Sequence, residues 1–81
     1  MSYYVYVLKS ESAKKHYVGY TSDLNKRLEE HNAGESRYTR SYRPWRLIYS
    51  EIKHSLAEAK KREEFFKTGD GRNALLNLTK G

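Results

Sequence analysis

One carboxylate stands where the sequence predicts an apolar helix face. The apolar face of an expected helix over residues 56–67 is marked by Leu56, Ala59 and Phe66. Glu63 lies among them, and an inward carboxylate must be paired, protonated or bound to a metal. The structural interpretation is a buried ion pair. The functional one is a hard divalent cation, because Mg²⁺ takes oxygen ligands and needs only one carboxylate when a substrate phosphate supplies further oxygens.

An arginine and a histidine one helical turn apart are predicted to face inward as well. Leu24 and Leu28 define the apolar stripe of an expected helix over residues 23–32. Arg27 and His31 fall on or beside this stripe, and a guanidinium is costly to bury without a partner. Arg27 therefore indicates either a structural salt bridge, for instance with the carboxylate above, or a functional site. His31 is either a hydrogen-bonded core histidine or a functional one.

Two tyrosines and a glycine are predicted to share one face of a β-hairpin. Residues 4–6 (Tyr-Val-Tyr) and 17–19 (Tyr-Val-Gly) favour short strands, because Tyr and Val suit pleated, half-buried surfaces. With a turn centred on residues 12–13, Tyr6 lies opposite Gly19 and Leu8 opposite Tyr17, which makes the two phenols diagonal neighbours. A slip of one residue would invert this arrangement. The predicted register favours a polar site on that face and not only a core.

The elements that must position these side chains form a mixed α/β (α+β) layer with a small sheet, in the order β-β-α-β-α-α. Strands are expected over residues 3–9, 16–20 and 45–52, and helices over 23–32, 56–67 and 72–78. Ser55 and Glu58 fit a capping box, and Gly34 fits a helix C-terminus. Residues 36–43 are expected to be irregular or a short helix. Residues 69–71 (Gly-Asp-Gly) are expected to interrupt the helical structure after residue 67, before a terminal helix that packs through Leu75, Leu76 and Leu78.

Length and composition limit the class of protein. The 81 residues are expected to form a single domain, residues 1–81, with one modest core. The chain has no cysteine, which excludes a disulfide scaffold and a thiolate metal site. No apolar run approaches the roughly 20 residues that cross a membrane. No basic and apolar leader is visible, so a cytoplasmic location is expected.

Charge points to a nucleic-acid partner. The formal net charge is +6, with 16 Lys and Arg against 10 Asp and Glu. No acid occurs between residues 35 and 51, where four arginines recur at every third position: Arg37, Arg40, Arg43 and Arg46. Tyr38, Tyr42 and Trp45 are interleaved with them. Guanidinium groups pair with phosphates, and aromatic rings stack on bases, although Trp45 fits a core position equally well.

These features together resemble the GIY-YIG nuclease superfamily over essentially the whole chain. Residues 4–6 stand at the first triplet of the family name and residues 17–19 at the second. Residues 24–31 (Leu-x-x-Arg-Leu-x-x-His) match the helix that follows, and residues 58–63 match the helix with the acidic residue. Residues 69–72 are similar to the tail of small stand-alone members. The resemblance implies a three-stranded antiparallel sheet flanked by helices, as in the incision domain of the bacterial nucleotide-excision repair nuclease.

The resemblance also implies metal-dependent endonuclease activity on DNA, including repair intermediates or branched DNA. Carried over to this sequence, Glu63 would hold Mg²⁺ or Mn²⁺. Tyr6 and Tyr17 would flank the attacking water, one of them as general base. Arg27 would stabilise charge on the phosphate, and His31 would assist by hydrogen bonding or proton transfer. In addition, Gly19 would let the phosphate approach the strand.

Departures from the family pattern leave alternatives open. Tyr4 and Val5 replace the Gly and Ile of the family name, and Tyr20 stands where the repair nucleases have a lysine. Asn73 and Asn77 are both candidates for a late asparagine that some members use. No separate DNA-binding domain is expected within these 81 residues, so weak selectivity, a partner protein or a homodimer is expected. The alternatives to an enzyme are a non-catalytic nucleic-acid-binding module and a protein-interaction domain with a basic surface.

Overall fold

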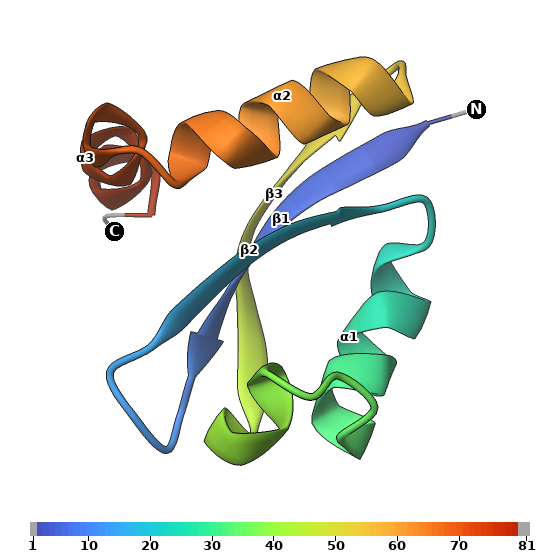
Figure 1. The fold of residues 1–81 in the computed structure, drawn as a ribbon, viewed down its shortest axis with the longest axis vertical. Helices are drawn as coiled ribbons and strands as arrows, with labels where there is room; N and C mark the ends of the chain where they lie inside the picture. The colour runs from blue at the N-terminus through green and yellow to red at the C-terminus, as the bar shows by residue number, and fades with distance from the viewer. Residues whose placement is uncertain (1, 80–81) are drawn as a thin grey trace.

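A computed structural model of the chain, which describes residues 2–79, has a three-stranded antiparallel sheet at its centre (Figure 1). Strand β1 is Tyr3–Ser10, β2 is His16–Thr21 and β3 is Trp45–Lys53. The strand order is β2-β1-β3, so β1 is hydrogen-bonded on both sides and β2 is an edge strand. The predicted α+β fold with three antiparallel strands is confirmed.

The hairpin register agrees with the prediction from the sequence. Tyr6 pairs with Gly19, and Leu8 pairs with Tyr17. On the other side of β1 the register shifts between Val7 and Leu8, which face Tyr49 and Leu47 respectively. One extra residue in β3 therefore lies opposite the shift, as in a β-bulge.

The sheet carries a separate hydrophobic cluster on each face, because side chains alternate along a strand. Val5 packs with Ala59, Phe66 and Tyr49 on one face. Tyr6 and Leu8 pack on the other with Trp45, and Tyr17, Leu24, Leu28, Tyr42 and Leu47 lie against them. The bulge explains why Leu47 and Tyr49, two residues apart, serve opposite faces: without the extra residue they would point the same way.

Helix α1, Leu24–Ala33, covers the Tyr6 face. The Asp23 side chain accepts a hydrogen bond from the Lys26 amide at its start. Gly34 ends the helix at φ 85°, a left-handed conformation that favours glycine. A short 3₁₀ helix, η1 (Thr39–Tyr42), follows before β3. These boundaries are close to those predicted.

Helix α2, Leu56–Phe66, covers the Val5 face, and the Ser55 hydroxyl accepts a hydrogen bond from the Glu58 amide at its N-terminus as predicted. Leu56 does not mark the buried face: it is 50% exposed. Helix α3 is Gly69–Leu78 and crosses the end of α2 (Figure 1). No helix among residues 2–79 is long and apolar enough to span a membrane.

The expected break at residues 69–71 was wrong. Thr68 caps α3 by accepting from the Gly71 amide, so these residues form its first turn. A side chain at Gly71 would collide with the Phe65 carbonyl, which explains the glycine by close packing of the two helices. Leu75 packs on the core, whereas Leu76 and Leu78 are 67% and 46% exposed, contrary to the expectation that all three leucines are buried.

Candidate active site

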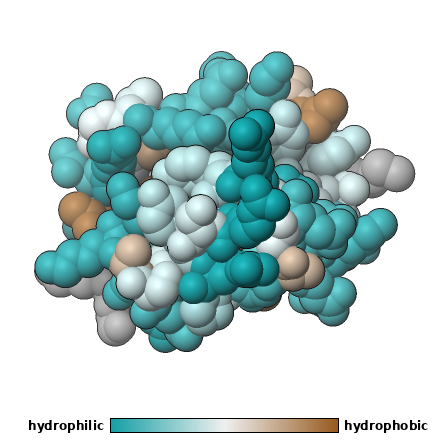
Figure 2. All heavy atoms as spheres, turned by 60° about the horizontal axis from the view of Figure 1, so that its bottom comes forward, coloured by the Kyte–Doolittle hydropathy of each residue, from teal (hydrophilic) through white to brown (hydrophobic). Residues whose placement is uncertain are grey.

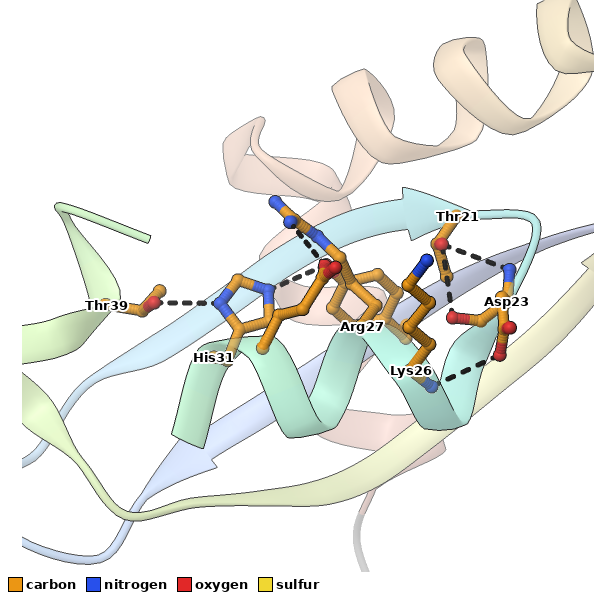
Figure 3. Close-up of polar contacts among 8 residues, drawn as sticks. Thr21, Asp23, Lys26, Arg27, His31 and Thr39 are labelled. Atoms are coloured by element: carbon orange, nitrogen blue, oxygen red, sulfur yellow. Dashed lines mark hydrogen bonds and ion pairs between the residues drawn. The ribbon is translucent and has the colours of Figure 1, made fainter. Parts of the chain in front are cut away.

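A buried chain of hydrogen bonds joins three elements on the α1 face of the sheet. The Tyr6 hydroxyl on β1 lies 2.9 Å from His31 Nε2 on α1. The other ring nitrogen, Nδ1, lies 2.8 Å from the Thr39 hydroxyl on η1 (Figure 3). All three residues are at most 1% exposed. Trp45 extends the chain, because its indole N–H donates to the Thr39 carbonyl at 2.7 Å.

His31 is a neutral imidazole in this setting. Burial, with the nearby Arg27 charge, lowers the pKa of His31 below its usual 6.5. A neutral ring has one N–H donor and one acceptor nitrogen, so Tyr6 and Thr39 must play opposite roles toward it. His31 is therefore a buried, hydrogen-bonded residue that fixes the phenol of Tyr6, and its expected assistance to the reaction stays a prediction.

Tyr6 is held as a protonated phenol. Burial raises the pKa of Tyr6 to about 12, although the Arg27 guanidinium beside it acts in the opposite direction. A phenol with this pKa is a hydrogen-bonding group at neutral pH, not a base. The lowering effect of Arg27 on the pKa of Tyr6 is therefore outweighed by burial.

Gly19 is required where β2 passes the Tyr6 ring. A Cβ atom built there would lie 2.6 Å from the Tyr6 hydroxyl oxygen, which is closer than Cβ atoms lie to other heavy atoms in proteins. The glycine therefore makes room for the phenol. Its expected role in letting a phosphate approach the strand stays a prediction.

Tyr17 is the tyrosine of the pair that reaches the surface. It is half-buried, its ring centroid lies 6.2 Å from that of Tyr6, and it lies 4.9 Å from the ring of His31. On its other side the ring lies 6.2 Å from Tyr38, which is 57% exposed. Tyr17 thus connects the buried network to solvent.

Arg27 is held at the margin of the site by an acid of its own helix. Its Nη1 donates to Glu30 Oε1 at 3.1 Å, and the Arg27 side chain is 36% exposed. Burial disfavours the charged guanidinium, but Glu30 and the Tyr6 hydroxyl outweigh it and raise the pKa of Arg27. Glu30, three residues further along the same helix, turns toward this guanidinium.

Glu63 is largely buried on α2, with its side chain 15% exposed, as the helical pattern predicted. It does not pair with Arg27: its Oε2 lies 3.4 Å from the Lys67 ammonium, one turn further along α2. No group of three or more His, Cys, Asp or Glu that could hold a metal occurs within residues 2–79. A lone carboxylate fits Mg²⁺ only in the mode in which waters and substrate phosphate supply the other ligands.

A groove with a volume of about 720 Å³ joins the tyrosine side of the site to the Glu63 side. We call it the basic groove; its lining includes Lys14, Lys15, Tyr17, Tyr38, Lys67 and Arg72 and no acidic residue. Tyr17 belongs both to this groove and to the aromatic cluster around His31. Lys67 belongs to the groove and is the partner of Glu63. The groove therefore runs from Tyr17 to Lys67 past edge strand β2, whereas Tyr6, Arg27, His31 and Glu63 themselves do not line it.

The four predicted nucleic-acid-binding arginines are all exposed, at and beside η1. The molecular face at that end is covered largely by hydrophilic residues (Figure 2). Arg46 lies 3.6 Å from Glu11, and both side chains are more than half exposed. Trp45 belongs to the core at 3% exposure, so it does not stack on bases. Exposure is consistent with phosphate binding by Arg37, Arg40 and Arg43, which stays a prediction.

Three participants had not been predicted: Thr39, Glu30 and Lys67. Lys67 could have been found, since it follows Glu63 by four residues and such pairs meet on a helix. Thr39 lies eight residues after His31, and no local pattern signals that contact. The candidate asparagines, Asn73 and Asn77, are both exposed on α3.

Comparison with known proteins agrees with this geometry. Residues 2–75 match the sequence model of the GIY-YIG catalytic domain. The UPF0213 proteins of Staphylococcus aureus strains Mu3 and N315 are each 41% identical over 68 residues, which is 83% of this chain and 82% of theirs. The solution NMR structure of a UPF0213 protein from Bacillus halodurans matches with a TM-score of 0.60 at 32% identity. That match covers all of this chain and 88% of the other.

Proposed function

From the fact that this chain belongs to the GIY-YIG catalytic-domain family, a nuclease superfamily, we propose that it is a metal-dependent endonuclease that hydrolyses phosphodiester bonds in DNA. The observation that carries the proposal is the basic groove, which has Tyr17 on one side and the Lys67 partner of Glu63 on the other. A purely structural hairpin would not need an acid-free groove between these two groups. Branched or repair-related DNA is the proposed substrate, and a partner protein or a homodimer would add selectivity.

Glu63 is the proposed ligand of Mg²⁺ or Mn²⁺. The Glu63 carboxylate is largely buried, and its ion-pair partner is the ammonium of Lys67, whose side chain is 57% exposed. A cation bound there would supply a more acidic water and stabilise charge on the phosphate. Binding by one carboxylate would be weak without substrate, because Mg²⁺ sites of this kind use substrate oxygens.

Tyr17 is the proposed tyrosine that faces the attacking water. Tyr6 has its hydroxyl bonded to His31 and its pKa raised to about 12, so it is suited to positioning. Tyr17 lines the groove where a water and a phosphate can enter. In this scheme Tyr6 and His31 hold the Tyr17 ring by packing against it, at 6.2 and 4.9 Å between ring centroids.

Arg27 is the proposed group that stabilises negative charge on the phosphate. It is permanently cationic, and its ion pair with Glu30 leaves it partly exposed beside Tyr6. A guanidinium has five N–H donors, so it can hold Glu30 and still donate to a phosphate oxygen.

The test compares Glu63→Gln with Glu64→Gln, a matched change at the exposed neighbour on α2. Plasmid and branched DNA are incubated with the protein and Mg²⁺ or Mn²⁺, and nicking is followed on gels. We expect Glu63→Gln to lower the rate by more than about 100-fold, since metal stabilisation is worth several kcal/mol, and Glu64→Gln to leave it unchanged. If all three proteins bind DNA and none cuts, the chain is a non-catalytic nucleic-acid-binding module.

A further inference from the structure

The basic groove has a chemical character that suits one kind of ligand. Lys14 and Lys15 stand on the loop between β1 and β2, and Lys67 and Arg72 stand on the α2–α3 side. These four cations are all exposed, and none of the lining residues is acidic. A polyanion that passes between the loop and the helices would meet positive charge on both sides.

The groove also carries an exposed aromatic ring. Tyr38 is 57% exposed, and its ring is supported by Tyr17 at 6.2 Å and by Tyr42 at 5.9 Å between centroids. Tyr42 is held in turn by Trp45 at 6.5 Å, with the ammonium of Lys15 5.6 Å from its centroid. A large ring that is packed against a cluster of tilted rings and is itself largely exposed can serve as a platform for a flat apolar ligand.

We propose that the basic groove binds an unpaired stretch of single-stranded DNA, with Tyr38 stacking on a base and the four cations contacting phosphates. Cations together with a stacking aromatic are the two components of single-strand binding sites. A base must leave the duplex stack before it can lie on Tyr38, so the groove discriminates against fully paired DNA. The proposal deepens the proposed function, on which it rests, by specifying DNA with an unpaired segment next to the cleaved bond.

Tyr17 gives the position of the segment relative to the reaction. A strand on Tyr38 would also pass Tyr17, whose ring centroid lies 6.2 Å away, and Lys67, the ion-pair partner of Glu63, lines the same groove. Cleavage is therefore expected near a junction between paired and unpaired DNA.

Binding is measured by fluorescence anisotropy with EDTA present, so that no cleavage is needed. The probes are a labelled single-stranded oligonucleotide and a blunt duplex of the same length. We expect tighter binding of the single strand, and Tyr38→Ala to weaken it roughly 10- to 100-fold while Tyr38→Phe retains it. Equal affinity for the duplex, or an unchanged affinity in Tyr38→Ala, would overturn the proposal.

A pair of adjacent lysines provides the matched control. Lys14→Ala with Lys15→Ala should reduce the slope of log affinity against log salt by about 1.4, at about 0.7 for each phosphate contact on a single strand. Lys60→Ala with Lys61→Ala, a double change with the same loss of charge at exposed positions of α2 outside the groove, should leave the slope unaltered. Equal slopes in the two double variants would refute the groove as the binding site.

The outcome separates this inference from the proposed enzyme activity. Single-strand binding that depends on Tyr38, without any nicking by the wild type, supports the groove and rejects the nuclease. Nicking that depends on Glu63, without a preference for single strands, supports the nuclease and rejects the groove. Thermal unfolding of each variant, followed by circular dichroism, identifies any variant that fails to fold. If Tyr38→Ala fails to fold, the affinity of Tyr38→Phe and the salt dependence of the two lysine double variants test the groove in its place.

Discussion

The two tyrosines of the site are expected to fail in different ways when their hydroxyls are removed. In Tyr6→Phe, His31 Nε2 loses its partner at 2.9 Å while it stays fully buried. An unsatisfied buried polar group costs about 1–3 kcal/mol, and we expect about 2 kcal/mol because the ring nitrogen has no route to water. At roughly 4–8 °C per kcal/mol for a domain of this size, the midpoint of thermal unfolding should fall by roughly 8–16 °C.

Tyr17→Phe should leave stability almost unchanged and remove activity. The residue is half-buried and lines the basic groove, which Tyr6 does not. A change at such a position usually alters stability by less than about 0.5 kcal/mol. If Tyr17 assists proton transfer from the attacking water, nicking should fall by about 100-fold or more.

The assay is thermal unfolding by circular dichroism, combined with nicking measured well below both unfolding midpoints. Two results would refute the reasoning. A Tyr6→Phe protein as stable as the wild type would show that the hydroxyl–imidazole bond contributes nothing to the fold. A Tyr17→Phe protein that nicks DNA at the wild-type rate would remove this tyrosine from the proposed mechanism.

Four other outcomes are expected. Burial raises the pKa of Tyr6 from 10.0 to about 12, so the unfolded chain releases this proton at lower pH than the folded chain does. The free energy of unfolding should therefore fall as the pH rises from about 10 to 12, and urea unfolding of Tyr6→Phe should not show this fall. Burial lowers the pKa of His31 below 6.5, so on acidification the unfolded chain binds this proton before the folded chain does. The free energy of unfolding in urea should therefore fall as the pH drops below about 6.5, and no fall would be seen if the imidazole were charged in the folded protein. Thr39→Val should cost about 1–3 kcal/mol in urea unfolding because His31 Nδ1 loses its partner, whereas Thr39→Ser should restore most of it; equal losses would mean that packing, not the hydroxyl, matters. Gly19→Ala should destabilise by about 1–3 kcal/mol in the same assay through overlap with the Tyr6 hydroxyl, and wild-type stability would show that β2 shifts freely.

Local patterns predicted the parts of the fold that depend on neighbours in sequence. The Ser55 cap, the Gly34 terminus and the hairpin register all follow from short-range chemistry, and the structure has them. The register followed from placing the turn at residues 12–13, which puts Tyr6 opposite Gly19.

Long-range features were not predictable in the same way. The bulge in β3 depends on which residues each face of the sheet must receive, and nothing near Leu47 signals it. The terminal helix begins three residues earlier than expected because Gly71 packs against the α2 backbone, which outweighs the low helix propensity of glycine. Helical spacing placed Glu63 and His31 inward, but it could not show that Glu63 pairs with Lys67 and His31 with Thr39.

The two sides of the basic groove differ in how firmly the fold holds them. Tyr17 lies on β2 against the buried Tyr6–His31 network, and the β2 amides that donate to the central strand β1 should exchange only when the whole domain unfolds. Arg72 lies on α3, where Leu76 and Leu78 are exposed, so this helix should open locally and exchange early. We therefore expect the β2 side of the groove to be rigid and the α3 side to be flexible. The groove could then adjust its width to the bound strand while the tyrosines keep their geometry.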